Sequence, residues 1–77
     1  MDLKLYYKPE CPFCVRVLDF MKENNIELEM KNIHDGTNKE DLIKKGGKDQ
    51  VPCLFIDGKA MYESLDIIDF LKQTFNK

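Results

Sequence analysis

The chain has 77 residues, of which 43% are hydrophobic and 34% charged, and its 14 acidic against 12 basic residues give a formal charge of -2. This length predicts one domain over residues 1–77, and the composition is typical of a compact globule and excludes a disordered or fibrous protein. The small negative charge provides no broad cationic surface for phosphates. We therefore expect no nucleic-acid partner.

The sequence predicts neither a membrane-spanning segment nor a signal peptide for export. The apolar runs are only a few residues long, and Met1-Asp2-Leu3 does not resemble the basic start and apolar stretch of a signal peptide. We therefore expect a monomer in the cytoplasm with no membrane partner. The 3 cysteines are too few for a secreted disulfide framework, and a close pair in a reducing compartment indicates reactive or metal-binding thiols.

The first elements in chain order are a strand, a helix and a second strand. Apolar residues alternate at Leu3, Leu5 and Tyr7, which predicts a strand over residues 3–7. A helix is predicted to begin near Pro12, whose missing N–H would have no partner in a first helical turn, and to end near residues 24–25. Residues 26–30 alternate again and predict a second strand with one buried face. This order predicts a parallel crossover.

The next elements are a short helix and a hairpin. Thr37 followed three residues later by Glu40 is a capping box, and the helix that it starts is predicted to stop at 46–47, a pair of glycines. The apolar run 51–56 predicts a strand. The Asp57-Gly58 turn then predicts an antiparallel return over residues 59–62.

A last helix is predicted to follow, capped by Ser64. Its buried stripe is expected at Leu65, Ile67, Ile68, Leu71 and Phe75. The predicted order is thus βαβ, helix, ββ, helix, which is an α/β class with a mixed sheet.

Cys11 and Cys14, in the run Cys11-Pro12-Phe13-Cys14, carry the predicted chemistry. A thiolate is the nucleophile in disulfide exchange, and an ordinary thiol is mostly protonated near neutral pH. A position just before a helix directs free N–H groups and the positive dipole end at the Cys11 sulfur, and Lys8 adds a cation. Cys14 lies one turn into the helix on its buried face. Cys11 is therefore the expected nucleophile and Cys14 the resolving thiol.

Zinc is the main alternative for a Cys-x-x-Cys pair. A structural zinc site needs four ligands, and only Cys53 and His34 remain in this chain. The redox interpretation is favoured, and we expect no metal. Cys53 lies in an apolar run and is expected to be a buried structural thiol, while His34 is expected in a solvated loop.

Three segments resemble a glutaredoxin: Lys8-Pro9-Glu10-Cys11-Pro12-Phe13-Cys14, Val51-Pro52 and Tyr62-Glu63-Ser64. The resemblance covers essentially the whole chain. It implies the thioredoxin-like fold, a four-stranded mixed sheet flanked by three helices. It also implies a glutathione-dependent enzyme that reduces protein disulfides and glutathione mixed disulfides, with disulfide-containing or glutathionylated proteins as partners.

The resemblance also implies roles for single residues. Cys11 would hold the glutathionylated intermediate and Cys14 would resolve protein disulfides, while Phe13 would border the glutathione groove. The backbone of Val51 would pair with the ligand, as in strand addition, and Pro52 would be a cis-proline.

Polar residues would hold the two ends of glutathione. Glu63 and Ser64 would accept the γ-glutamyl end, since a carboxylate pairs with an ammonium and a helix start binds a carboxylate. Lys8 is a candidate for the glycine carboxylate. A cluster of three lysines competes for that role: Lys44, Lys45 and Lys48.

Two departures from the common pattern keep alternatives open. Gln50 stands where many glutaredoxins have Thr, and Ala60-Met61 where many have Gly-Gly. Gln-Val-Pro with Glu-Ser is instead similar to the thioredoxin-like domain of glutathione transferases. One alternative is a glutaredoxin-like protein reduced by thioredoxin reductase. Another is a glutaredoxin that binds an iron–sulfur cluster, although Pro12 and a second active-site cysteine argue against it.

Overall fold

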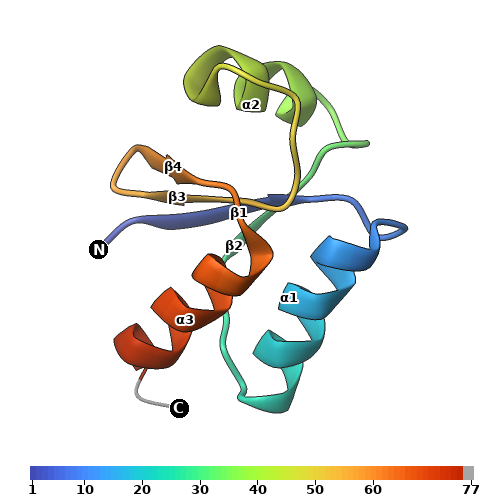
Figure 1. Ribbon diagram of the computed structural model, residues 1–77. Helices are drawn as coiled ribbons and strands as arrows, with labels where there is room; N and C mark the ends of the chain where they lie inside the picture. The colour runs from blue at the N-terminus through green and yellow to red at the C-terminus, as the bar shows by residue number, and fades with distance from the viewer. Residues whose placement is uncertain (76–77) are drawn as a thin grey trace.

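The computed structural model describes residues 1–75 and forms a mixed sheet with helices on both faces (Figure 1). The elements in chain order are β1 (Leu3–Tyr7), α1 (Pro12–Glu23), β2 (Glu29–Asn32), α2 (Asn38–Gly46), β3 (Cys53–Ile56), β4 (Lys59–Met61) and α3 (Ser64–Phe75). The strand order is β2-β1-β3-β4. β1 and β2 are parallel, whereas β1 with β3 and β3 with β4 are antiparallel. This is the predicted thioredoxin-like fold.

Helices cover both faces of the central strands, so neighbouring residues of one strand enter different cores. Figure 1 shows α2 on one face and α1 with α3 on the other. The core under α1 and α3 contains Leu5, Val17, Met21, Ile26, Leu54, Ile67 and Leu71. The core under α2 contains Tyr6, Leu42, Cys53 and Phe55.

The first strand does not alternate between buried and exposed side chains as expected, because Tyr6 is buried. Its side chain is as buried as that of Leu5, and its ring packs edge-on against Phe55 with 5.2 Å between ring centroids. A strand with an exposed face alternates in polarity, whereas a strand covered on both faces buries successive residues. β1 is of the second kind because α2 packs over it.

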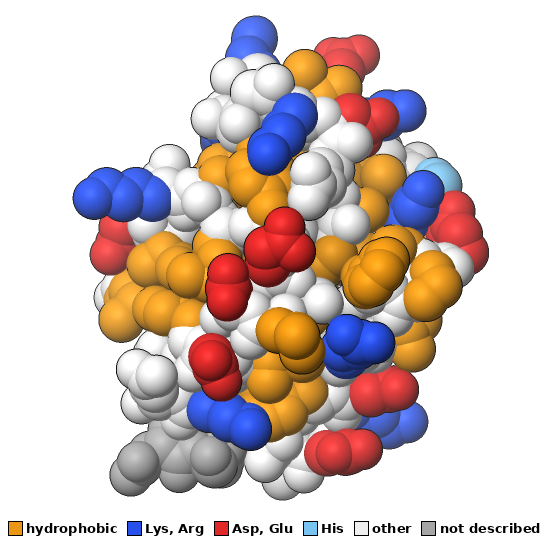
Figure 2. All heavy atoms as spheres, viewed as in Figure 1, with side chains coloured by type: hydrophobic (Ala, Val, Ile, Leu, Met, Phe, Trp, Pro, Cys, Tyr) orange, Lys and Arg blue, Asp and Glu red, His pale blue; other side chains and the backbone are white. Residues whose placement is uncertain are grey.

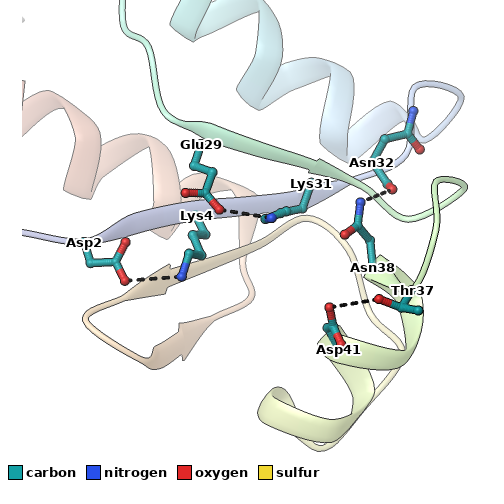
Figure 3. Close-up of polar contacts among 8 residues, drawn as sticks. All are labelled: Asp2, Lys4, Glu29, Lys31, Asn32, Thr37, Asn38 and Asp41. Atoms are coloured by element: carbon teal, nitrogen blue, oxygen red, sulfur yellow. Dashed lines mark hydrogen bonds and ion pairs between the residues drawn. The ribbon is translucent and has the colours of Figure 1, made fainter.

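The second strand begins later than predicted. β2 runs from Glu29, which pairs with Lys4 of β1, while Ile26 donates its N–H to the Met21 carbonyl at 2.9 Å and so completes the end of α1. Ile26 is buried because it packs in the core under α1 and α3, although it is not part of a strand. The exposed face of β2 carries an ion pair between Lys31 and Glu29 at 3.0 Å (Figure 3).

The predicted capping box at Thr37 is wrong. Thr37 occupies the N-cap position, but within residues 1–75 its side chain makes no capping bond and instead donates to Asp41 at 3.4 Å (Figure 3). Its ψ of 13° is not the extended backbone that aims a capping side chain at the helix. Asn38 secures the helix start by donating to the Asn32 carbonyl at 2.8 Å. The left-handed Gly47, with φ of 85°, ends α2 as predicted.

The start of α3 also differs from the prediction. Ile67 donates its N–H to the Glu63 carbonyl at 2.9 Å, so Glu63 takes the cap position and Ser64 is the first helical residue. Ser64, Ile67 and Leu71 are the buried residues. Leu65 lies beside that stripe and is 64% exposed, so its predicted place in the core is wrong.

Candidate functional site

Cys11 lies in the connection between β1 and α1, at the N-cap of the helix. Its carbonyl accepts the first helical hydrogen bond, from the Val15 N–H at 2.9 Å, and Pro12 follows as the first helical residue. Its backbone is extended, with φ of -81° and ψ of 122°, which is the geometry of a capping residue. The sulfur of Cys11 is therefore held at the positive end of α1.

This environment favours the thiolate of Cys11. Its partial burial acts to raise the pKa, but hydrogen bonds from the Cys14 N–H, the Cys14 thiol and the Phe13 N–H, together with the charge of Lys8, outweigh burial and hold the pKa below its ordinary value. Helix N-termini and neighbouring cations lower the pKa of reactive cysteines in this way. Cys11 is thus the activated thiol of the pair.

Cys14 has the opposite character. Its side chain is fully buried on the inner face of α1, and burial, helped by the interaction with the Cys11 sulfur, raises its pKa to about 11. Cys14 therefore stays protonated when Cys11 is ionised and donates its S–H to the thiolate. Both cysteines are free thiols in this structure.

A first cleft of about 400 Å³ lies beside this pair. Its lining comes from α1, from the segment before β3 and from the start of α3, and consists of Phe13, Arg16, Gln50, Val51, Pro52, Tyr62, Glu63, Ser64, Leu65 and Asp66. Phe13 and Leu65 are 57% and 64% exposed and form an apolar part of the rim. Figure 2 shows that the face over α1 and α3 carries hydrophobic patches separated by acidic and basic side chains.

A second cleft of about 330 Å³ shares Gln50 and Val51 with the first. It is lined by Lys8, Cys11, Ile33, His34, Lys39, Asp49, Gln50 and Val51. Cys11 is thus reached from this cleft, whose walls carry two lysines. One of them, Lys39, pairs with Asp49 at 3.4 Å.

Val51 and Pro52 connect the two clefts. The peptide bond between them is cis, as the resemblance implies. Val51 is half-buried and precedes β3, so its backbone lies outside the pairs that β3 makes with β1 and β4. An unpaired backbone segment of this kind can accept an extended ligand.

The structure brings Lys8, Cys11 and Val51 together in one cleft and Phe13, Pro52, Glu63 and Ser64 in the other. The three lysines that were predicted to compete with Lys8 line neither cleft. Lys44 and Lys45 lie in the exposed last turn of α2, and Lys48 lies over the ring of Tyr62 with 4.4 Å between its Nζ and the ring centroid.

Several residues of the clefts were missed from the sequence, among them Lys39, Arg16 and Asp66. Lys39 lies in the first turn of α2 and enters the second cleft. Arg16 lies one turn after Phe13 and is 5.8 Å from its ring centroid. Asp66 lies in the first turn of α3 and also lines the first cleft, together with Glu63. The spacing of Arg16 from Phe13 was the available signal.

His34 and Cys53 have the environments predicted for them. His34 is exposed, but its Nε2 contacts a Glu10 carboxylate oxygen at 2.7 Å and so links the β2–α2 loop to the residue before Cys11. Cys53 is fully buried under α2, and burial raises its pKa to about 11. Within residues 1–75, no group of three or more His, Cys, Asp or Glu side chains is placed to hold a metal ion.

None of the helices within residues 1–75 has the length and apolar character needed to cross a membrane.

Comparisons with known proteins agree with this architecture. Residues 5–77 match the family described as glutathione S-transferase, N-terminal domain. A glutaredoxin from Haemophilus influenzae is 31% identical over an alignment that covers 97% of this chain and 95% of the relative. The chain belongs to the glutaredoxin family. A second relative in this glutaredoxin family, glutaredoxin 3 of Escherichia coli K12, is 27% identical over 75% of this chain and 71% of its own.

Solved structures extend the comparison to the fold. Glutathione transferase Omega 3C from Trametes versicolor superposes with a TM-score of 0.79 at 30% identity and covers 100% of this chain, but the match spans only 35% of the transferase. A mutant of a thioredoxin-like protein superposes with a TM-score of 0.75 at 28% identity, over 96% of this chain and 99% of its own. Together with the family, these relatives support a thiol–disulfide redox function.

Proposed function

We propose that this glutaredoxin is a glutathione-dependent dithiol oxidoreductase that uses Cys11 as nucleophile and Cys14 as resolving thiol. The observation that carries the proposal is the opposite shift of the two thiols: the pKa of Cys11 is lowered and that of Cys14 is raised to about 11. The nucleophile must be a thiolate, whereas the resolving thiol should stay protonated until the mixed disulfide at Cys11 has formed. Disulfide-containing and glutathionylated proteins are the proposed partners.

Reduction of a glutathione mixed disulfide needs only Cys11. The Cys11 thiolate attacks the glutathione sulfur, and the disulfide bond between that sulfur and the substrate protein breaks. The substrate protein leaves as a thiolate, which takes a proton from water. A second glutathione, as thiolate, then attacks the glutathione sulfur held on Cys11. This forms oxidised glutathione and returns the Cys11 thiolate.

Reduction of a protein disulfide also uses Cys14. Cys11 attacks one substrate sulfur and forms a mixed disulfide, which removes the negative charge next to Cys14. Loss of that charge removes one cause of the raised pKa of Cys14, so its proton is given up more readily. The Cys14 thiolate attacks the Cys11 sulfur and releases the reduced substrate. Two glutathione molecules then reduce the Cys11–Cys14 disulfide.

The two clefts support glutathione as the reductant. Glutathione has a charged amino-acid end and a distant glycine carboxylate. The first cleft offers Glu63 for the ammonium and the N–H groups at Ser64, where α3 begins, for the α-carboxylate. The second cleft offers Lys8 and Lys39 for the glycine carboxylate.

The middle of the ligand is assigned to the residues shared by or bordering both clefts. Val51 would pair its backbone with the cysteine of glutathione, Pro52 would line the same groove, and Phe13 would cover one side. A ligand bound in this way would have its sulfur near Cys11, which lines the second cleft.

Turnover of a glutathionylated peptide tests the proposal. We expect wild type to consume NADPH with glutathione and glutathione reductase, Cys11→Ser to fall to background, and Cys14→Ser to keep much of the activity. Equal rates for wild type and Cys11→Ser would contradict the assigned nucleophile. If the protein turns over with thioredoxin reductase alone and shows no turnover with glutathione, the electrons come from thioredoxin reductase and not from glutathione.

A further inference from the structure

Two segments that are distant in the sequence line the first cleft. One is the stretch 50–52, which follows α2, and the other is the stretch 62–66, which enters α3. Glu63 and Ser64, to which we assign the γ-glutamyl end, belong to the second stretch. The relative position of the two stretches therefore determines the shape of the cleft.

The side chain of Tyr62 connects the second stretch to the end of α2, just before the first stretch. Its hydroxyl donates to the Gly46 carbonyl at 2.7 Å, and the ammonium of Lys48 lies 4.4 Å from its ring centroid. Gly46 and Lys48 flank Gly47, the left-handed residue at which the chain turns away from α2 toward the cleft. One aromatic side chain thus contacts both sides of the turn that leads into residues 50–52.

The contact at Gly46 is closely packed. A methyl group added at Gly46 would overlap the Tyr62 hydroxyl and would lie 3.3 Å from the ring of Phe55. Tyr62 also packs against the core under α2, which contains Leu42, Cys53 and Phe55. The ring is therefore held by the core, by the end of α2 and by Lys48.

We propose that Tyr62 is a positioning residue that sets the affinity of the first cleft for glutathione by clamping the segment after α2 to the start of α3. Glu63 follows Tyr62 directly, so a displacement of the Tyr62 ring is passed to the glutamyl-binding turn through one peptide unit. The inference deepens the proposed function and rests on it. Tyr62 itself takes no part in thiol exchange.

Tyr62→Phe tests the hydrogen bond while keeping the ring and its contact with Lys48. We expect the KM for glutathione to rise about two- to tenfold, the range that corresponds to loss of one hydrogen bond. The rate at which iodoacetamide alkylates Cys11, measured without glutathione, should be unchanged. Tyr7→Phe is the matched control because the Tyr7 hydroxyl makes no hydrogen bond within residues 1–75, and its KM should equal that of wild type.

Gly46→Ala tests the same contact from the other side. The added methyl displaces the Tyr62 hydroxyl, so the KM should again rise. In the double variant Gly46→Ala/Tyr62→Phe the hydroxyl is absent and only the lesser contact with Phe55 stays, so the KM should lie close to that of Tyr62→Phe and well below the product of the two single effects. Residues that act through one contact give such non-additive effects, whereas independent effects multiply.

The outcomes separate this inference from the proposed function. If Tyr62→Phe leaves the KM unchanged while wild type turns over normally, or if the two substitutions multiply, the clamp is overturned and the function stands. If wild type shows no glutathione-dependent turnover, both are overturned. Should Gly46→Ala not fold, Tyr62→Phe against Tyr7→Phe decides the question alone.

Discussion

Replacing Cys14 with alanine is expected to raise the pKa of Cys11. In the wild type the Cys14 thiol donates a hydrogen bond to the Cys11 sulfur, in addition to the backbone N–H groups of Cys14 and Phe13 and the charge of Lys8. Alanine keeps both N–H groups at the start of α1 but removes the thiol donor. The Cys11 thiolate then loses one of its stabilising interactions.

The size of this effect follows from the strength of that hydrogen bond. A thiol is a weak donor, so a net contribution of about 0.5–1.5 kcal/mol is appropriate, which corresponds to a rise of about 0.4–1 pKa unit. The backbone N–H groups and Lys8 remain, so part of the original lowering should persist. Cys14→Ser restores a donor at the same position and should bring the pKa back toward that of wild type.

Alkylation with iodoacetamide is the assay for the Cys11 pKa, and it also measures the ratio of the reaction rates of Cys11 and Cys14. With a pKa of about 11 for Cys14, only about 10⁻⁴ of that thiol is ionised at pH 7, against about 3% for an ordinary thiol. Cys11 should therefore react with iodoacetamide at least ~300-fold faster than Cys14 at that pH. The pH dependence of the first alkylation reports the Cys11 pKa in wild type, Cys14→Ala and Cys14→Ser.

Two results would refute this reasoning. One is a Cys11 pKa in Cys14→Ala that equals or lies below that of wild type, because the thiol could not then be a stabilising donor. The other is a peptide map in which the first alkylated residue is Cys14 or Cys53.

Three further predictions concern charge, packing and pH. Lys8→Gln should raise the Cys11 pKa by less than Cys14→Ala does, because the charge of Lys8 is the smallest of the contributions that lower the Cys11 pKa. The same alkylation profile measures both variants, and a larger rise in Lys8→Gln would contradict that order. Leu54→Ala should lower the free energy of unfolding in urea by about 2–5 kcal/mol because Leu54 is fully buried, while Leu65→Ala, 64% exposed, should change it by under about 0.5 kcal/mol; similar values for the two would contradict the assigned core. Burial raises the pKa of Cys53 to about 11, so its stabilising contribution is complete below the unfolded pKa and is lost as pH rises through about 11. The difference in unfolding free energy between wild type and Cys53→Ala should therefore narrow above about pH 8.5, by up to about 1.4 kcal/mol per pH unit, and a constant difference would count against it.

Features that depend on local sequence were predictable. Pro12 and the Asp57-Gly58 turn fixed a helix start and a hairpin, and the two-residue spacing of Cys11 and Cys14 placed both thiols at one helix end. These signals depend on backbone chemistry within a few residues. The element order followed from local signals of this kind, whereas the thioredoxin-like fold was expected from the resemblance to glutaredoxins.

Features that depend on packing between elements were not predictable. β2 begins at Glu29 because its register is set by pairing with Lys4 of β1, a contact across the sheet. Tyr6 is buried because α2 covers β1. The choice of Lys39 over Lys44 and Lys45 for the second cleft depends on how α2 is oriented over the sheet. A lysine cluster in one helix gives no such information, since its members face different directions.

Mass spectrometry of the Cys14→Ser protein after treatment with oxidised glutathione determines whether the Cys11 thiolate accepts a glutathionyl group. Without a resolving thiol the mixed disulfide should accumulate. We expect one glutathionyl group per chain, on the peptide that contains Cys11, and its removal by added glutathione. A glutathionyl group on Cys53, or an unmodified Cys11, would show that Cys11 is not the residue that accepts glutathione.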